Sequence, residues 1–194
     1  MNFESSWLLI PLWILLFVLD NYLTVIVSRR YQTQDPQIIE FQGGYELTPQ
    51  FKQEITRGQM FGPRFLRNLV IFTAVLLLVR YLVTLGWFSI AYYQFLMGTL
   101  ILLSCAVNIR HAQNMVFFGL IPVLESPIGK IVYPSSFSYR GSAIGFLSFS
   151  LFYLLLSGVQ MSLFVLGGAF GCLVIAISHW RLSNRTHKEN DVAH

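Results

Sequence analysis

Residues 92–114 read YYQFLMGTLILLSCAVNIRHAQN. The first 18 of them, Tyr92 to Ile109, carry no charge, and as a helix they come close to the length of about 20 apolar residues that a bilayer core requires. Polar side chains cluster at the end of this stretch and directly after it: Asn108, Arg110, His111 and Asn114. Because residues three or four apart share a helix face, these four can point towards a common interior. The stretch therefore predicts a membrane-spanning helix that ends in a candidate site.

The whole chain has the composition of a membrane protein. Of its 194 residues 55% are hydrophobic and 11% are charged, whereas soluble domains carry about 25% charged residues. The net charge of +4 comes from basic residues spread over several loops, and no basic run is interleaved with aromatic residues. The expected surroundings are therefore a lipid bilayer, and nucleic acid is not expected as a partner.

Five apolar segments predict an all-α integral membrane protein, folded as one membrane domain over residues 1–194. The predicted transmembrane helices are residues 7–27, 69–88, 92–109, 143–159 and 162–180. The two longer loops are residues 28–68 and 110–142. Only Ser89, Ile90 and Ala91 separate the second span from the third, so these two helices should be antiparallel neighbours.

The two long loops are predicted to form a small cytoplasmic platform. Residues 38–41 and 45–47 flank Gln42, Gly43 and Gly44, which is typical of a short β-hairpin, and a helix is expected over residues 48–56. Residues 130–133 are a candidate strand partner for residues 40–47.

Two further segments are not expected to form spanning helices. Residues 115–124 are apolar but too short to cross a bilayer, so they are expected at the membrane surface. The polar tail, residues 181–194, is expected to be disordered.

The distribution of basic residues predicts the orientation in the membrane. Of the 13 Lys and Arg residues, Arg80 lies within a span, and the other 12 fall on one side if the loops alternate. Under the positive-inside rule this places the N-terminus outside and the C-terminus in the cytoplasm. The expected location is a prokaryotic plasma membrane.

Polar and charged side chains in or beside the spans form the candidate binding site. A charge within a span costs at least about 2.5 to 3.5 kcal/mol, so such a group normally has a partner or reaches water. Asp20 and Arg80 lie on consecutive antiparallel helices and are predicted to form a salt bridge or a water-linked pair. The alternative for this pair is a proton or ion path. The full candidate set, expected to form a connected cluster beneath the platform, is Asp20, Asn21, Arg80, Asn108, Arg110, His111, Asn114 and His179.

Two glycine pairs have the G-x-x-x-G spacing that lets helices approach closely in lipid. They are Gly141 with Gly145 and Gly167 with Gly171. The second pair is predicted to line a close helix contact. The alternative for either pair is that glycine is simply common in membrane helices.

No catalytic motif or metal-ligand spacing is found in the sequence, so neither a catalytic residue nor a cofactor is predicted. The leading hypothesis is a non-enzymatic multi-pass protein that acts as a structural or accessory subunit, as a homo-oligomer or within a larger membrane complex. The alternative is a small ion or solute transporter or channel that uses the polar cluster. A third possibility is a membrane-embedded enzyme, or a protein that holds a haem between His111 and His179.

Overall fold

A computed structural model describes residues 7–34, 39–41, 59–120 and 131–192 of the chain. This part contains five long helices: α1 (Leu9–Gln34), α3 (Pro63–Thr84), α4 (Ile90–Leu120), α5 (Ser135–Gln160) and α6 (Leu163–Val192). Each of them is long and apolar enough to cross a membrane. The chain is a multi-pass transmembrane protein, which confirms the predicted all-α membrane fold.

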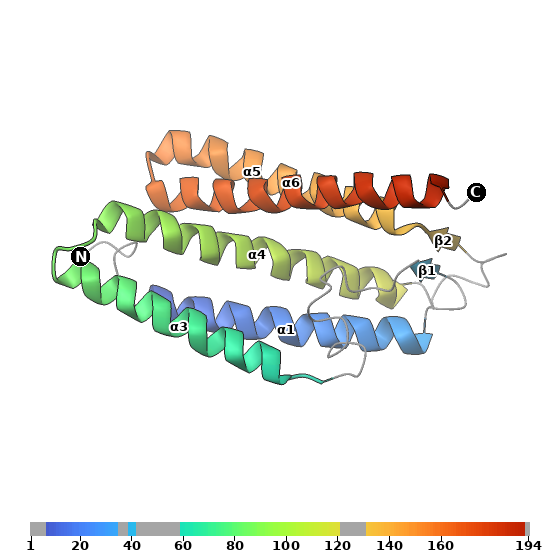
Figure 1. Ribbon diagram of the computed structural model, residues 1–194, viewed down its shortest axis with the longest axis horizontal. Helices are drawn as coiled ribbons and strands as arrows, with labels where there is room; N and C mark the ends of the chain where they lie inside the picture. The colour runs from blue at the N-terminus through green and yellow to red at the C-terminus, as the bar shows by residue number, and fades with distance from the viewer. Residues whose placement is uncertain (1–6, 35–38, 42–58, 121–130, 193–194) are drawn as a thin grey trace.

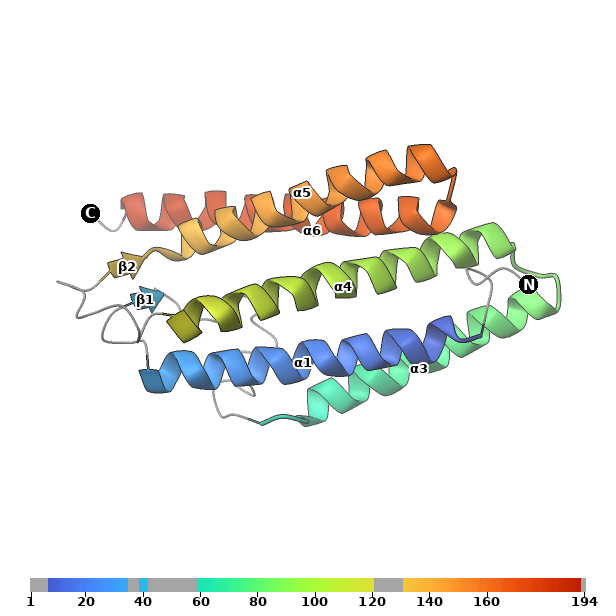
Figure 2. The same ribbon diagram turned by 180° about the vertical axis from the view of Figure 1, so that it is seen from behind.

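The helices lie side by side with α4 in the middle (Figure 1). Helix α4 packs against α1 on one side and against α6 on the other, and α5 packs mainly against α6. Helix α3 lies at the periphery and makes few contacts with α1 and α4. Figure 2 shows the same order from behind. Two ends can be distinguished: the turn end, with the α3–α4 and α5–α6 connections, and the strand end, with the two short strands.

Short connections at the turn end make antiparallel pairs of α3 with α4 and of α5 with α6. Gly86 follows α3 with φ of 75°, a left-handed conformation that glycine adopts without a steric cost. In the second connection Met161 has φ of 52°, and the Ser162 hydroxyl accepts a hydrogen bond from the Val165 amide at 3.3 Å. This serine caps the first turn of α6.

Two short strands pair at the strand end. Strands β1 (Ile39–Phe41) and β2 (Ile131–Tyr133) run parallel, with Glu40 opposite Val132. The predicted pairing of residues 130–133 with the region that begins at residue 40 is therefore confirmed for the described strands. Because β1 follows α1 and β2 precedes α5, the pair links the end of α1 to the start of α5. The second arm of the predicted hairpin and the helix over residues 48–56 lie outside the described residues.

Several helices extend beyond the spans predicted from hydropathy. Helix α4 continues to Leu120, so the prediction of a separate surface segment is wrong for residues 115–120, while residues 121–124 lie outside the described part. Helix α6 continues to Val192, so the prediction of a disordered tail is wrong up to that residue. Extending an existing helix costs less than nucleating a new one, and the tail contains Arg, Lys and Glu, which are good helix formers.

Glycines bring α4 and α6 into close contact. A Cβ at Gly98 would overlap the backbone carbonyl of Phe164, and one at Gly167 would overlap the carbonyl of Phe95. At Gly171 a Cβ would lie 3.0 Å from the Thr99 side chain. The predicted close contact at Gly167 and Gly171 is therefore confirmed. Nothing lies within 4 Å of a Cβ at Gly141, and a Cβ at Gly145 would meet only the Arg110 side chain, at 3.6 Å, so this pair does not bring two backbones together.

The outer faces of the bundle are apolar, as expected for surfaces in lipid. On α5, large exposed side chains include Leu151, Phe152 and Leu155. Helix α3 is the least covered: only 11% of its most apolar segment is buried, against 44% for α6. This makes α3 the helix with the most surface available for lipid or for another protein.

Candidate functional site

The start of α3 gives a reference for how deep the polar residues of α1 lie in the bundle. The side-chain amide of Asn21 donates a hydrogen bond to the carbonyl of Met60, just before α3 begins. The start of α3 is therefore level with Asn21, while α1 runs on for 13 more residues to Gln34, about 20 Å at 1.5 Å per residue. Asp20 consequently lies at the depth where α3 begins.

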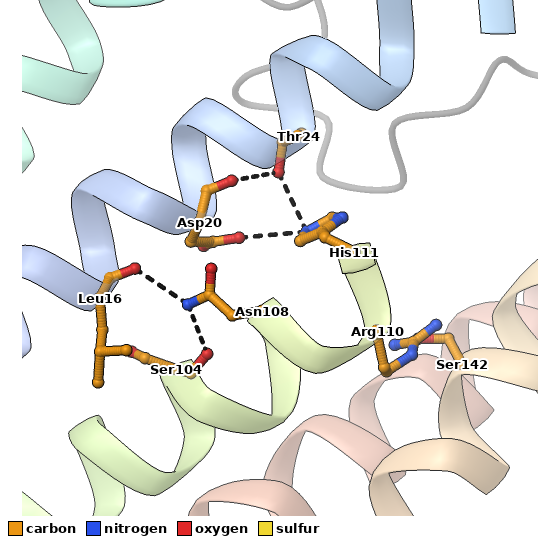
Figure 3. Close-up of polar contacts among 8 residues, drawn as sticks. All are labelled: Leu16, Asp20, Thr24, Ser104, Asn108, Arg110, His111 and Ser142. Carbon is orange, nitrogen blue, oxygen red and sulfur yellow. Dashed lines mark hydrogen bonds and ion pairs between the residues drawn. The ribbon is translucent and has the colours of Figure 1, made fainter. Parts of the chain in front are cut away.

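The first part of the site joins α1 to α4 (Figure 3). His111 Nε2 lies 3.1 Å from Oδ1 of Asp20 and 3.0 Å from the hydroxyl oxygen of Thr24. The Thr24 hydroxyl itself donates to the backbone carbonyl of Asp20 at 2.8 Å. Asp20 and Thr24 are four residues apart, so both face α4 from one side of α1. Nδ1 of His111 is buried and has no hydrogen-bond partner among the described residues.

Asn108 makes a second contact between the same helices, one turn before His111. Its side-chain nitrogen donates to the carbonyl of Leu16 on α1 at 3.0 Å and to the carbonyl of Ser104 on its own helix at 2.8 Å. The Leu16 carbonyl lies one turn before Asp20, so Asn108 is held directly beside the Asp20 side chain. Figure 3 shows these residues together between the two helices.

The second part of the site joins α4, α5 and α6. Arg110 donates to the hydroxyl of Ser142 at 2.6 Å, and that hydroxyl lies 2.6 Å from Nδ1 of His179. The Arg110 guanidinium also sits 4.7 Å from the ring centroid of Phe146. Arg110 and His111 are adjacent in the chain, so their side chains lie about 100° apart around α4, and they contact different helices, α5 and α1 respectively. The polar residues accordingly form two groups, one on each side of this helix.

A further hydrogen-bonded group lies between α5 and α6. Arg140 donates to the Ser183 hydroxyl at 3.2 Å, and Ser183 donates to the carbonyl of Ser136 at 2.9 Å. Ser183 is fully buried. This group shows that the polar contacts between α5 and α6 extend beyond the candidate residues.

The predicted pairing of Asp20 with Arg80 is wrong. The Arg80 guanidinium sits 5.0 Å from the ring centroid of Trp7 and 5.4 Å from that of Tyr93, near the turn end. Trp7 lies two residues before α1 begins and 13 residues before Asp20, about 20 Å along the helix axis. The prediction assumed that both helices reach equal depth at their shared loop, whereas α3 starts level with Asn21. Arg80 therefore lies near the turn end, far from Asp20, and Asp20 pairs with His111 instead.

The structure thus brings Asp20, Asn108 and His111 together, and separately Arg110 and His179. Asn21 contacts Met60, and Asn114 is half-buried on α4. Two participants were missed from the sequence. Thr24 carries a usable signal, because it is polar, lies within an apolar run and follows Asp20 by one helical turn. Ser142 carries no such signal, since serine is frequent along α5.

The hydrogen bonds limit what the Asp20 group can do chemically. Activation of a hydroxyl nucleophile requires the imidazole to accept the hydroxyl proton, while a carboxylate orients the other ring nitrogen. Here the Thr24 hydroxyl donates to a carbonyl, and both Asp20 and Thr24 contact the same nitrogen of His111. The arrangement suits holding two helices together or binding a proton better than activating Thr24. The chain matches no protein-family model, no curated protein sequence and no solved structure.

Proposed function

We propose that this chain is a non-enzymatic membrane protein that acts as a structural or accessory subunit, as a homo-oligomer or in a larger complex. One observation carries the proposal: polar side chains at one depth direct their hydrogen bonds to neighbouring helices of the same chain. Asn108 and His111 connect α4 to α1, and Arg110 connects α4 to α5. A polar network used in this way rigidifies a bundle.

The surface of α3 supports assembly with other subunits. Its exposed face carries Val70, Ile71, Val75, Leu78 and Tyr81. Only a small share of this helix packs against the rest of the chain, so a second protein can cover it without displacing any internal contact. The mass of the purified chain in mild detergent tests this directly. A mass of two or more chains, or of a stable complex, is expected; a strictly monomeric chain with no co-purifying subunit would contradict it.

His111→Ala is expected to destabilise the bundle if the polar network is structural. The substitution removes the contacts of His111 with Asp20 and Thr24, and polar contacts between membrane helices contribute about 0.6 to 2 kcal/mol. Thermal unfolding in mild detergent measures the change. Asn184→Ala, at an exposed position on α6, is the control and should unfold like the parent. An unchanged unfolding midpoint for His111→Ala would count against a structural role.

We further propose that the chain lies in a prokaryotic plasma membrane with its N-terminus outside and the strand end in the cytoplasm. Arg29, Arg30, Arg140 and Arg185 lie towards the strand end of their helices, which supports this orientation under the positive-inside rule. Ser89 is exposed in the connection between α3 and α4 at the turn end.

A cysteine at Ser89 therefore tests the orientation. In a background with Cys105 and Cys172 changed to alanine, Ser89→Cys should react with a membrane-impermeant thiol reagent in intact cells. A matched variant, Asn184→Cys, should react only after the cells are lysed, because α6 carries it towards the strand end. The opposite labelling pattern would reverse the topology.

A transporter or channel is a second candidate, favoured by Nδ1 of His111, a buried nitrogen without a hydrogen-bond partner among the residues that the structure describes. Ionisable residues within membrane spans often mark paths for protons or ions. Vesicles that contain the purified chain and a pH-sensitive dye test the proton case. A proton flux that is lost in His111→Ala would favour this candidate over the structural one, and equal leakage with and without protein would exclude it for protons.

A further inference from the structure

Arg80 carries a charge that the described part of the chain does not neutralise. Its guanidinium sits 5.0 Å from the ring centroid of Trp7 and 5.4 Å from that of Tyr93, and no carboxylate among the described residues contacts it. Its Nε is buried without a hydrogen-bond partner in the same part of the chain. A charged side chain within a spanning helix normally has a partner or reaches water, so Arg80 requires an anion that the described residues do not supply.

The two aromatic rings hold the guanidinium in place. Cation–π contacts form within about 6 Å of a ring centroid, and both distances lie below that value. Tyr93 is fully buried and forms a fixed wall, whereas Trp7 is exposed. The Arg80 side chain is half-buried and Nε is its buried nitrogen, so the terminal nitrogens Nη1 and Nη2 are those that reach the surface. These two nitrogens can donate two parallel hydrogen bonds, which suits the oxygens of a phosphate.

The guanidinium lies at the depth of a lipid headgroup. Trp7 precedes α1 by two residues, Tyr93 belongs to the first turn of α4, and Arg80 lies four residues before the end of α3, about 6 Å along the axis. All three therefore lie towards the turn end of the bundle (Figure 1). Exposed aromatic side chains gather at the same end, among them Trp87 and Tyr92, and such residues are typical of the boundary between the hydrocarbon core and the headgroups.

We propose that Arg80, Trp7 and Tyr93 form a binding site for the phosphate group of an anionic phospholipid in the leaflet at the turn end. The surface next to Arg80 suits the apolar part of this ligand. Leu77 stands three residues earlier, so it lies on the same face of α3, one turn nearer the middle of the membrane, and it is exposed. A phosphate on Arg80 therefore places acyl chains along Leu77. This inference goes beyond the proposed role as a subunit and does not depend on it.

A lipid phosphate fits this position better than a free anion. A free phosphate would have to lose much of its water to reach a half-buried guanidinium beside apolar side chains. The phosphate of a phospholipid is already held at this depth by its acyl chains. The other basic residues of α3, Arg64 and Arg67, lie at least 13 residues away, about 20 Å along the helix, so on this helix Arg80 alone supplies the charge that recognises the phosphate.

Native mass spectrometry of the full-length chain in mild detergent tests the proposal, with phosphatidylglycerol as the added lipid. The parent is expected to bind it, and Arg80→Met should bind the tightest lipid at least roughly tenfold more weakly, because a hydrogen-bonded charge pair is lost. Arg67→Met is the matched control, since Arg67 is exposed at the other end of α3, and it should bind like the parent. Equal affinity in the parent and in Arg80→Met would overturn the proposal.

Two further ligands separate a lipid phosphate from other sources of binding. Diacylglycerol with the same acyl chains lacks the phosphate, so it should bind more weakly than phosphatidylglycerol and equally to the parent and to Arg80→Met. If it binds the parent as tightly as phosphatidylglycerol does, the proposal is wrong. An excess of inorganic phosphate should leave the bound phosphatidylglycerol in place. Displacement of the lipid would mean that the site takes a free anion, which contradicts the lipid assignment.

A second variant at Arg80 covers the case in which Arg80→Met does not fold. Arg80→Lys keeps the charge, and it should bind phosphatidylglycerol more weakly than the parent, because an ammonium group cannot donate two parallel hydrogen bonds. An unchanged affinity in this variant would contradict the site. The mass of the lipid-free chain in detergent reports assembly separately, so failure of the subunit proposal would leave this result interpretable.

A carboxylate of the chain itself is the competing partner for Arg80. Glu4 lies outside the described residues and is the acidic residue nearest to Trp7 in the sequence. Glu4→Gln should bind phosphatidylglycerol like the parent if the lipid is the partner of Arg80. Binding that appears in Glu4→Gln but not in the parent would assign Arg80 to that carboxylate and overturn the proposal.

Discussion

Gly167→Ala is expected to disrupt the packing of α4 against α6 and to lower the free energy of unfolding by roughly 3 kcal/mol, near the upper end of typical overpacking costs. An alanine Cβ would overlap the carbonyl of Phe95 and lie 2.9 Å from the backbone nitrogen of Thr99. Both are backbone atoms, so no side chain can rotate away and the helices themselves must separate. The separation also breaks the hydrogen bond from the Thr99 hydroxyl to the Gly167 carbonyl, 3.0 Å long.

Gly141→Ala is the matched control for this substitution. Gly141 lies within α5, and nothing approaches within 4 Å of a Cβ at that position. Alanine favours a helix over glycine by up to about 1 kcal/mol, so this variant should be as stable as the parent or slightly more stable. Denaturant unfolding of both variants in the same detergent makes the comparison. Equal stability of the two variants would mean that α4 and α6 do not approach as closely as described.

Arg110→Met is expected to lower the free energy of unfolding by about 2 to 3 kcal/mol. The guanidinium donates to Ser142 at 2.6 Å and stacks 4.7 Å from the ring centre of Phe146. A hydrogen bond from a charged group and a cation–π contact shielded from water each contribute on the order of 1 to 2 kcal/mol. Methionine keeps the apolar stem but removes both contacts, so this polar connection between α4 and α5 is lost. The buried Ser142 also loses its charged donor.

The control for Arg110→Met is Arg181→Met. Arg181 is exposed on α6, and its substitution removes the same charge from the same end of the bundle. Any general effect of lost positive charge on membrane insertion therefore appears in both variants. Unfolding of the two proteins in mild detergent should show a large loss for Arg110→Met and a change within about 0.5 kcal/mol for Arg181→Met. Similar losses would assign the effect to charge rather than to the contacts of Arg110.

Much of the architecture could be predicted because it depends on local properties. Apolar length identifies the spanning helices, and it does so for α3 as well as for the mixed stretch that forms α4. The spacing of Gly167 and Gly171 predicts a close helix contact, because small residues one turn apart leave a groove on any helix. The pairing of the strand at residues 131–133 with residues 39–41 could also be proposed, since few other short apolar runs occur in the two long polar loops.

The composition of the candidate site could be predicted only in part. Asp20, Asn108 and His111 stand out because polar groups in an apolar segment need partners. Their pairing could not be derived, because Arg80 is also charged and its helix is adjacent to α1 in the chain. Ser142 could not be identified either: it is one of several serines on α5, and only contact with Arg110 and His179 distinguishes it.

The sequence by itself determined which segments lie in the membrane, where glycine allows close packing and which residues require polar partners. Only the tertiary structure decided which partners they have. Apolar length acts within one helix, whereas a side-chain pair depends on the axial shift between two helices, and each residue of shift moves a side chain by about 1.5 Å. Because α3 begins level with Asn21, Arg80 is carried to Trp7 and Asp20 is left facing His111 and Asn108.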